Sequence, residues 1–167
     1  MVKNLKTKRE VIRVEGKLKE VVTVHDEKGK ILHKLMSPLM LEFHPRDVLQ
    51  IMIGAAILAI PVGYTEETWN LGQMLPLSNV MGFLILSLAF IAAFVYYNYY
   101  RDHLKEHLDE FIKRIFSTYI VAFVVVGILL TLIQKAPWTT DWILAFKRTI
   151  IVTFPSSMSA AIADIIK

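Results

Sequence analysis

The segment VLQIMIGAAILAIPVGYTEETW, from Val48 to Trp69, decides the fold of this 167-residue chain. It is uncharged and mostly apolar up to two adjacent carboxylates, Glu66 and Glu67. An α-helix rises 1.5 Å per residue, so about 20 residues cross the roughly 30 Å hydrocarbon core of a bilayer. We therefore expect a transmembrane helix over residues 48–68, with the carboxylates near one membrane surface.

Three more apolar runs follow, over residues 79–97, 116–134 and 143–166. The chain is 54% hydrophobic, yet its charged residues gather in the first 47 positions and in a block between the second and third runs. Apolar runs that alternate with charged segments are typical of proteins that cross a membrane several times. The sequence predicts an all-α polytopic membrane protein with four transmembrane helices over 48–167, preceded by a basic segment, 1–47.

The distribution of Lys and Arg predicts the orientation. Of the nineteen such residues, eleven precede the first span, none lies in 70–79, four lie in 98–115 and one lies in 134–142. Because cytoplasmic loops carry the excess of Lys and Arg, we expect both termini in the cytoplasm. Glu66 and Glu67 are then expected on the outer side.

Lys147 and Arg148 are the exception to this pattern, because they begin the fourth span on the outer side. Arg148 can pair there with Glu66, Glu67 or Asp141, either as a structural ion pair or as a gate. The charge asymmetry as a whole explains the net charge of +4. Membrane lipids are therefore the expected partners, and nucleic acid is not.

The residue inventory excludes several kinds of chemistry. The chain has no cysteine, which removes disulfides, thiolate metal sites and thiol nucleophiles. It also has no phosphate-binding loop, no dinucleotide fingerprint and no Ser, His and Asp in the spacing of a known hydrolase. We expect no enzymatic activity, and no cofactor other than a bound cation such as calcium or sodium.

Residues 10–35, EVIRVEGKLKEVVTVHDEKGKILHKL, alternate between apolar and polar side chains in short stretches. This period of two is typical of β-strands, and Asp26 to Gly29 is a typical turn sequence. We expect a small cytoplasmic β-hairpin or three-stranded meander. An isolated hairpin is only marginally stable in water, so it is expected to pack on the membrane surface, on the helices or on another subunit.

Small residues recur every four positions in the first span, at Ala55, Ala59 and Gly63. Such a stripe lets another helix approach closely. Glu66 and Glu67 follow Gly63 by three and four residues, so they are expected to continue the stripe. Two interpretations stay open: a packing face with a solvated acidic end, or the wall of a pathway whose carboxylates bind cations at its mouth.

The fourth apolar run is the most polar of the four. Its hydroxyl, small and acidic residues fall along one stripe, namely Thr149, Thr153, Ser156 or Ser157, Ala160 and Asp164. Proline lacks an amide donor, so Pro155 frees a carbonyl in this helix, and Pro61 is expected to kink the first span. A hydrated cation path uses such groups, but hydroxyls and small residues also hold packed helices together, and both interpretations stay open.

Residues 101–115 show helical periodicity, with apolar residues on one face at Leu104, Leu108, Phe111, Ile112 and Ile115. This pattern predicts a cytoplasmic amphipathic helix, next to a belt of tyrosines at the end of the second span. His103 and His107 lie four residues apart, a spacing that can bind a metal ion. A solvated polar face and a pH-sensitive contact are the alternatives.

Three motifs together resemble a known family. They are ILAIPVGYTEETWN (57–70), FVYYNYYR (94–101) and KRTIIVTFPSSMSAAIAD (147–164). Over about residues 46–167 the chain resembles a family of small prokaryotic integral membrane proteins of unknown function. The resemblance implies four spans in a prokaryotic cell membrane, and a role for Glu66, Glu67, Trp69 and the segment around Pro155. It implies no activity, and it leaves the N-terminal strands outside.

The polar residues of the spans predict a homo-oligomeric cation channel or transporter with an external acidic mouth. Four spans leave little room for a pathway inside one subunit, so the path is expected within an oligomer. Candidate ion-binding or selectivity residues are Glu66, Glu67, Asp141 and Asp164. Candidate pathway-lining residues are Thr65, Thr149, Thr153, Ser156 and Ser157. Candidate gating or structural residues are Pro61, Trp69, Arg148 and Pro155.

The alternative function is a membrane scaffold or sensor without transport activity. In that case the polar stripes pack helices together, and the cytoplasmic hairpin binds a partner or anionic lipid. Inorganic cations are partners only under the first hypothesis. The two hypotheses differ in the state of the fourth span, because a pathway wets one stripe of the helix and a packing seam stays dry.

Overall fold

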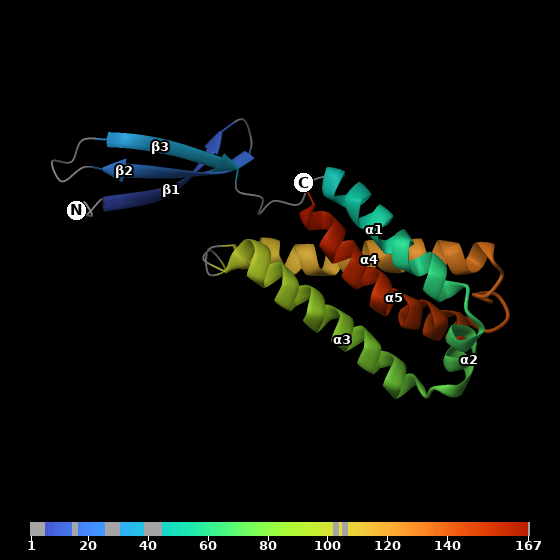
Figure 1. The fold of residues 1–167 in the computed structure, drawn as a ribbon. Coiled ribbons are helices and arrows are strands. Elements are labelled where there is room, and N and C mark those ends of the chain that lie inside the picture. Colours follow the sequence, from blue (N-terminus) through green and yellow to red (C-terminus); the bar gives the residue numbers. More distant parts are fainter. Residues whose placement is uncertain are drawn as a thin grey trace. The chain divides into compact units, whose positions relative to one another are not determined.

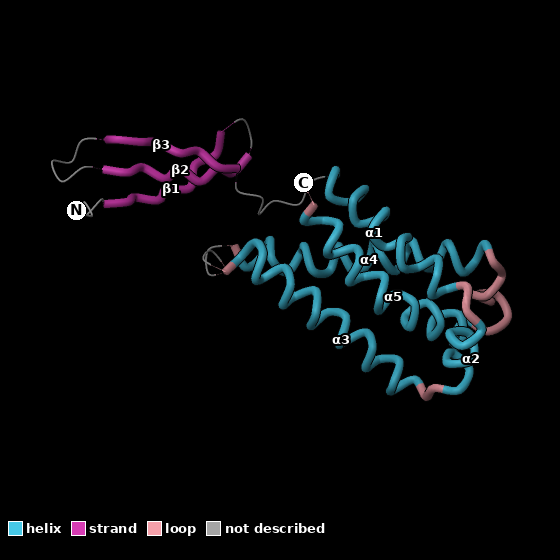
Figure 2. Tube along the Cα trace, in the orientation of Figure 1, coloured by secondary structure: helices cyan, strands magenta, loops and turns pink. Residues whose placement is uncertain are grey.

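The computed structural model of the chain describes residues 6–14, 17–25, 31–38, 45–101, 104 and 107–166. The chain divides into two compact units, Met1–Glu42 and Phe43–Lys167. The first unit contains the strands and the second contains the helices (Figure 1). Figure 2 distinguishes the two by colour.

The first unit is a three-stranded antiparallel meander. Its strands are β1 (Lys6–Val14), β2 (Lys17–His25) and β3 (Ile31–Pro38), paired in the order β1-β2-β3. β-branched residues favour this pleated, half-buried arrangement. Val21 of the central strand lies opposite Met36 of β3 and is 3% exposed. Of the two predicted arrangements, hairpin and meander, the structure has the meander.

The second unit is a helical bundle around α5. Its helices are α1 (Pro45–Gly63), α2 (Glu66–Met74), α3 (Leu77–Val95), the π-helix η1 (Tyr96–Tyr100), α4 (Leu108–Leu132) and α5 (Trp142–Ile165). α5 contacts all four of the α-helices that precede it, and it lies between α1, α3 and α4 (Figure 1). Twelve of its residues are buried, more than in any other described helix.

Three described helical segments are long and apolar enough to cross a membrane. They are Pro45–Gly63, Leu77–Tyr100 and Leu108–Leu132. α5 is not among them, since it carries Lys147, Arg148 and Asp164 together with several hydroxyl residues. The predicted polytopic fold thus has three candidate spans in the structure, and the fourth, 143–166, stays a prediction.

The first predicted span, 48–68, is divided in the structure. α1 ends at Gly63, and Glu66 and Glu67 form the first turn of the separate helix α2. Thr65 precedes that turn with extended backbone angles, φ −93° and ψ 142°, which are typical of a residue that begins a helix. Acidic residues in a first turn are stabilised by the helix dipole. The expectation that these carboxylates continue the small-residue stripe of α1 is therefore wrong.

The predicted amphipathic helix, 101–115, and the predicted third span, 116–134, meet in one helix. α4 runs without a break from Leu108 to Leu132. Residues 108–126 contain neither glycine nor proline, and the apolar face of the first segment continues into the second. The described residues therefore form no separate helix ahead of the third span.

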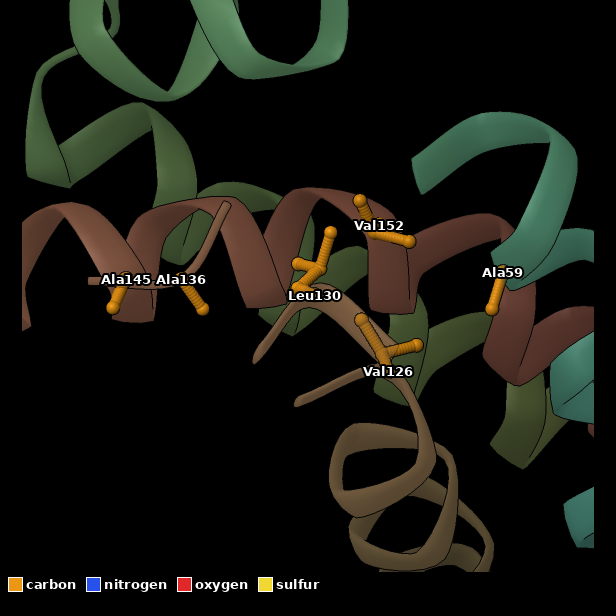
Figure 3. Close-up of a cluster of buried hydrophobic side chains, with 6 residues drawn as sticks. All are labelled: Ala59, Val126, Leu130, Ala136, Ala145 and Val152. Atoms are coloured by element: carbon orange, nitrogen blue, oxygen red, sulfur yellow. The ribbon is translucent and has the colours of Figure 1, made fainter. Parts of the chain in front are cut away.

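Small and branched side chains form the core between α1, α4 and α5. One cluster, drawn in Figure 3, joins Ala59, Val126, Leu130, Ala136, Ala145 and Val152. A second cluster joins Ile51, Ala55, Ala122 and Ala160. The small residues of α1 therefore face α4 and α5 of the same chain, which makes their stripe a packing face in this bundle.

Gly54 allows α1 and α5 to approach closely. A Cβ atom at this position would collide with the side chain of Ala163 and would lie 2.9 Å from the carbonyl oxygen of Ser159. Since one of these neighbours is backbone, the crossing has no room for a larger residue. Glycine at a helix crossing is the usual means of such close packing in membranes.

We expect Gly54→Ala to lower the free energy of unfolding by about 1–3 kcal/mol, the usual cost of overpacking a filled core. The matched control is Gly82→Ala in α3, where a Cβ atom would meet nothing within 4 Å. That change should be neutral or stabilise by up to about 1 kcal/mol, because alanine is the better helix former. Thermal unfolding in detergent, followed by circular dichroism, measures both; equal effects would contradict the close crossing.

Candidate functional site

A buried cluster of charged residues lies where α1 and α4 begin and α5 ends. Arg114 of α4 donates from Nε to Oδ2 of Asp164 on α5 at 2.8 Å, and its Nη2 lies 2.8 Å from the same oxygen. Nη2 also lies 3.6 Å from Oδ2 of Asp47 on α1. The three side chains are at most 2% exposed. Charges removed from water in this way require pairing, so the cluster joins three helices.

The π-helix η1 brings tyrosines into this cluster. The hydroxyl of Tyr99 donates to the backbone carbonyl of Asp164 at 3.0 Å, and the Tyr99 ring centroid lies 4.0 Å from Cζ of Arg114. Such cation–π contacts stabilise a desolvated guanidinium. Tyr100 is fully buried, whereas Tyr97 is 70% exposed. The wide turn of the π-helix therefore directs Tyr99 and Tyr100 into the bundle. Only part of the predicted tyrosine belt lies at the surface.

The polar cluster continues one turn into the bundle. A polar layer lies next to the second core cluster of Ile51, Ala55, Ala122 and Ala160. Its members are Asp47, Thr118 and Asp164, and each lies four residues, about one helical turn, from a member of that cluster. Among the described residues, buried Oδ1 of Asp164 and Oγ1 of Thr118 have no hydrogen-bond partner. The same holds for Oε1 of Gln50, whose Nε2 donates to the carbonyl of Ile166 at 2.8 Å. Because buried oxygens are normally paired, this layer has free capacity for a proton, a water molecule or a cation.

Near the other end of α5, Arg148 binds both α2 and the loop before α5. Its Nε donates to the carbonyl oxygen of Trp69 at 3.2 Å and its Nη1 to that of Lys135 at 2.8 Å. Trp69 in turn donates from Nε1 to the carbonyl of Gly63 at 2.8 Å, and Nζ of Lys135 lies 3.8 Å from its ring centroid. A Cβ atom on Gly72 would collide with the Arg148 side chain. These contacts connect α1, α2, α5 and the loop before α5.

The carboxylates predicted near this end lie at the surface. Glu66 and Glu67 are exposed on the first turn of α2. Asp141 is exposed as well, and its Oδ1 accepts a hydrogen bond from the backbone amide of Leu144 at 2.9 Å, which caps α5. The described residues show no ion pair between these carboxylates and Arg148, because Arg148 is already bound by backbone carbonyls.

Four hydroxyl residues of α5 that were predicted to line a path are fully buried: Thr149, Thr153, Ser156 and Ser157. Each donates to a carbonyl of its own helix at 2.6–3.0 Å. Thr65, at the start of α2, donates likewise to the carbonyl of Val62 at 2.9 Å. Pro155 lies within α5 and Pro61 within α1. In this conformation the stripe is dry, and its role in a pathway stays a prediction.

The predicted histidine pair lies at the edge of the described chain. His103 is outside the described residues, and His107 is half-buried just before α4. Within the ranges that the structure describes, no group of three or more His, Cys, Asp and Glu could hold a metal ion. A metal site at His103 and His107 therefore stays a prediction.

Sequence reasoning did not assign the basic member of the cluster. The buried face of α4 includes Val126, Ala122 and Thr118 at intervals of four, and one more interval leads to Arg114. This stripe was the available signal. It was obscured because the apolar residues of 101–115 define a neighbouring face of the helix.

Three described helical segments long and apolar enough to cross a bilayer are typical of an integral membrane protein. The chain belongs to the family described as "Putative integral membrane protein (DUF2391)", which it matches over residues 18–166. This confirms the predicted membrane family, although the match begins in β2 and so includes strands that the resemblance left outside. No curated protein and no solved structure matches the chain.

We expect Arg114→Gln to lower the free energy of unfolding by about 3 kcal/mol or more, because it leaves a buried carboxylate without its cation. The matched control is Lys113→Gln, next to it in sequence. Lys113 is 65% exposed and, among the described residues, pairs with Glu110 alone, so its loss should cost less than about 1 kcal/mol.

The double variant Arg114→Gln with Asp164→Asn should recover part of the loss, since Asp164 then carries no charge and only Asp47 keeps a buried one. Melting temperatures in detergent measure all of these variants. An Arg114→Gln variant as stable as Lys113→Gln would show that the buried pair does not hold the bundle.

Proposed function

We propose that this membrane protein moves a proton or a small inorganic cation across the bilayer, with Asp164 as the binding group. The observation that carries the proposal is that two buried oxygens of the described residues have no partner. They are Oδ1 of Asp164, whose Oδ2 binds Arg114, and Oγ1 of Thr118, which lies one turn after Arg114 on α4. An ionisable side chain enclosed by membrane helices is costly, and such residues commonly serve ion or proton pathways. Protonation or cation binding at Oδ1 would satisfy that oxygen.

The state of α5 supports a carrier rather than an open channel. Its hydroxyl stripe extends from the Asp164 end toward Arg148 and is buried along its length. An ion could follow it only after α5 shifts against α1 and α4. Pro155 interrupts the backbone hydrogen bonds midway along the helix, and interrupted helices hold the ion sites of many transporters.

Glu66 and Glu67 fit this proposal as an attracting site at the outer surface. Both are exposed at the start of α2. In a homo-oligomer, copies of this pair would gather near one another and raise the local concentration of cations. Calcium and sodium are both suited to the carboxylate and hydroxyl oxygens that the chain offers.

A membrane scaffold or sensor without transport is the second candidate. The hydrogen bonds of the α5 hydroxyls favour it, since each hydroxyl is satisfied within its own helix and requires neither water nor an ion. The charged cluster would then only join α1, α4 and α5. The N-terminal sheet would bind the partner.

Ion flux decides between the two. The purified protein is placed in liposomes under sodium, potassium, calcium and proton gradients. We expect flux in the wild type and its loss, to the level of empty vesicles, in Asp164→Asn, because the amide removes the ionisable group and keeps its shape. The matched control is Asp109→Asn, exposed in the first turn of α4, which should transport like the wild type.

Glu66→Gln combined with Glu67→Gln should lower flux at low salt and have little effect at high salt, where surface attraction is screened. Silent vesicles that contain folded wild-type protein would favour the scaffold. Transport by Asp164→Asn at the wild-type rate would remove Asp164 from the pathway. The chain has no cysteine, so single-cysteine variants at Thr149, Thr153 and Ser157 can report water access along α5 directly.

A further inference from the structure

An apolar groove of about 270 Å³ lies between α3 and α5. It is lined by Phe90, Ile91 and Phe94 of α3 and by Met158, Ala161 and Ile162 of α5. Ala161, the smallest of these side chains, is 4% exposed, whereas Phe90 and Ile162 are 47% and 52% exposed. The groove therefore has a buried floor at Ala161 and exposed apolar walls.

The groove is closed at one end and leads to a basic residue at the other. Phe90 packs against Phe154 of α5 with ring centroids 6.3 Å apart, which closes the groove toward the middle of the bundle. In the other direction α3 continues into η1. Tyr97 there is 70% exposed. Arg101 follows directly and is also exposed.

The length of this surface fits one leaflet of a bilayer. From Phe90 to Arg101 the helix advances by eleven residues, or about 16 Å at 1.5 Å per residue. Half of the hydrocarbon core is about 15 Å. A chain in the groove would therefore reach from the middle of the membrane to its surface, where Tyr97 and Arg101 would lie at the level of the lipid headgroups.

We propose that the groove binds an acyl chain of an anionic phospholipid, whose phosphate pairs with Arg101. The lining is suited to hydrocarbon and to no polar ligand. Arg101 is exposed, and a guanidinium makes bidentate contacts with phosphate. The distribution of Lys and Arg places this end of the bundle in the cytoplasmic leaflet, where anionic lipids concentrate. The site is independent of any transport through α5.

The test is a competition between phosphatidylglycerol and phosphatidylcholine for the purified protein. Equal amounts of the two are supplied in mixed micelles, and retained lipid is counted by native mass spectrometry. The wild type should retain phosphatidylglycerol about fivefold in excess, the preference expected from one basic residue at an anionic surface. Arg101→Gln should bring this ratio close to one without loss of total lipid. Lys113→Gln removes a positive charge from α4, away from the groove between α3 and α5, and should leave the ratio unchanged.

Ala161→Phe fills the floor of the groove and should abolish retention of both lipids. The proposal would be overturned if the wild type retained equal amounts of the two lipids. It would also be overturned if Arg101→Gln kept the preference for phosphatidylglycerol. If Ala161→Phe fails to fold, these two measurements still decide. The proposal would also fail if Ile162→Cys formed a disulfide-linked dimer that retains no lipid, because a second copy of the chain would then occupy the groove.

Discussion

The exclusion of water from the interior of the bundle is the constraint on which this structure depends. α5 carries hydroxyls, a carboxylate and a guanidinium, and every such group must find its partners within the protein. The hydroxyls bind carbonyls of their own helix, Asp164 binds Arg114, and Arg148 binds two backbone carbonyls. Because α1, α3 and α4 surround this helix, their own outer faces can remain apolar.

The two ends of α5 are held by different chemistry. Arg148 is bound by the carbonyls of Trp69 and Lys135, which keep their charge distribution under all conditions. Arg114 is bound by the carboxylate of Asp164, whose charge is lost when it takes up a proton. One end of the helix is thus permanently fixed, and the other is fixed only while its carboxylate is ionised. This asymmetry is what a helix would need if it pivots about one end when an ion or a proton binds at the other.

Patterns within one segment were sufficient for much of the fold. Long apolar runs predicted α1, α3 and α4, and the period of two in residues 10–35 predicted a hairpin or a meander, of which the structure has the meander. The break between α1 and α2 was missed because the signals for a helix start, Thr65 followed by two acids, stand in a run whose length alone satisfied a span. These helix-start signals are local. They decide the break against the length of the apolar run because Trp69 donates a hydrogen bond to the carbonyl of Gly63 and so closes the end of α1.

The buried cluster was less accessible to sequence reasoning, because its members are distant along the chain. Arg114 and Asp164 are fifty residues apart, and periodicity tells which face of a helix is buried but not which helix covers it. The inward turn of Tyr99 depends on a π-helix, which no propensity predicts from YYNYY. Asp164 was singled out as a polar group within an apolar run, but its partner Arg114 was not. Pairings of this kind require the fold to be known first.

The central position of α5 has a consequence for how the protein enters a membrane. This helix is not among the described segments that are long and apolar enough to cross a membrane, and it follows the other described helices along the chain. During synthesis, α1, α3 and α4 therefore emerge before it, and Arg114 is in place before Asp164 is made. Insertion of α5 is then an assembly step as much as a partitioning step, in which the earlier helices act as its solvent. Because α5 is made after the helices that pack around it, partners for its polar groups are already present when it is buried.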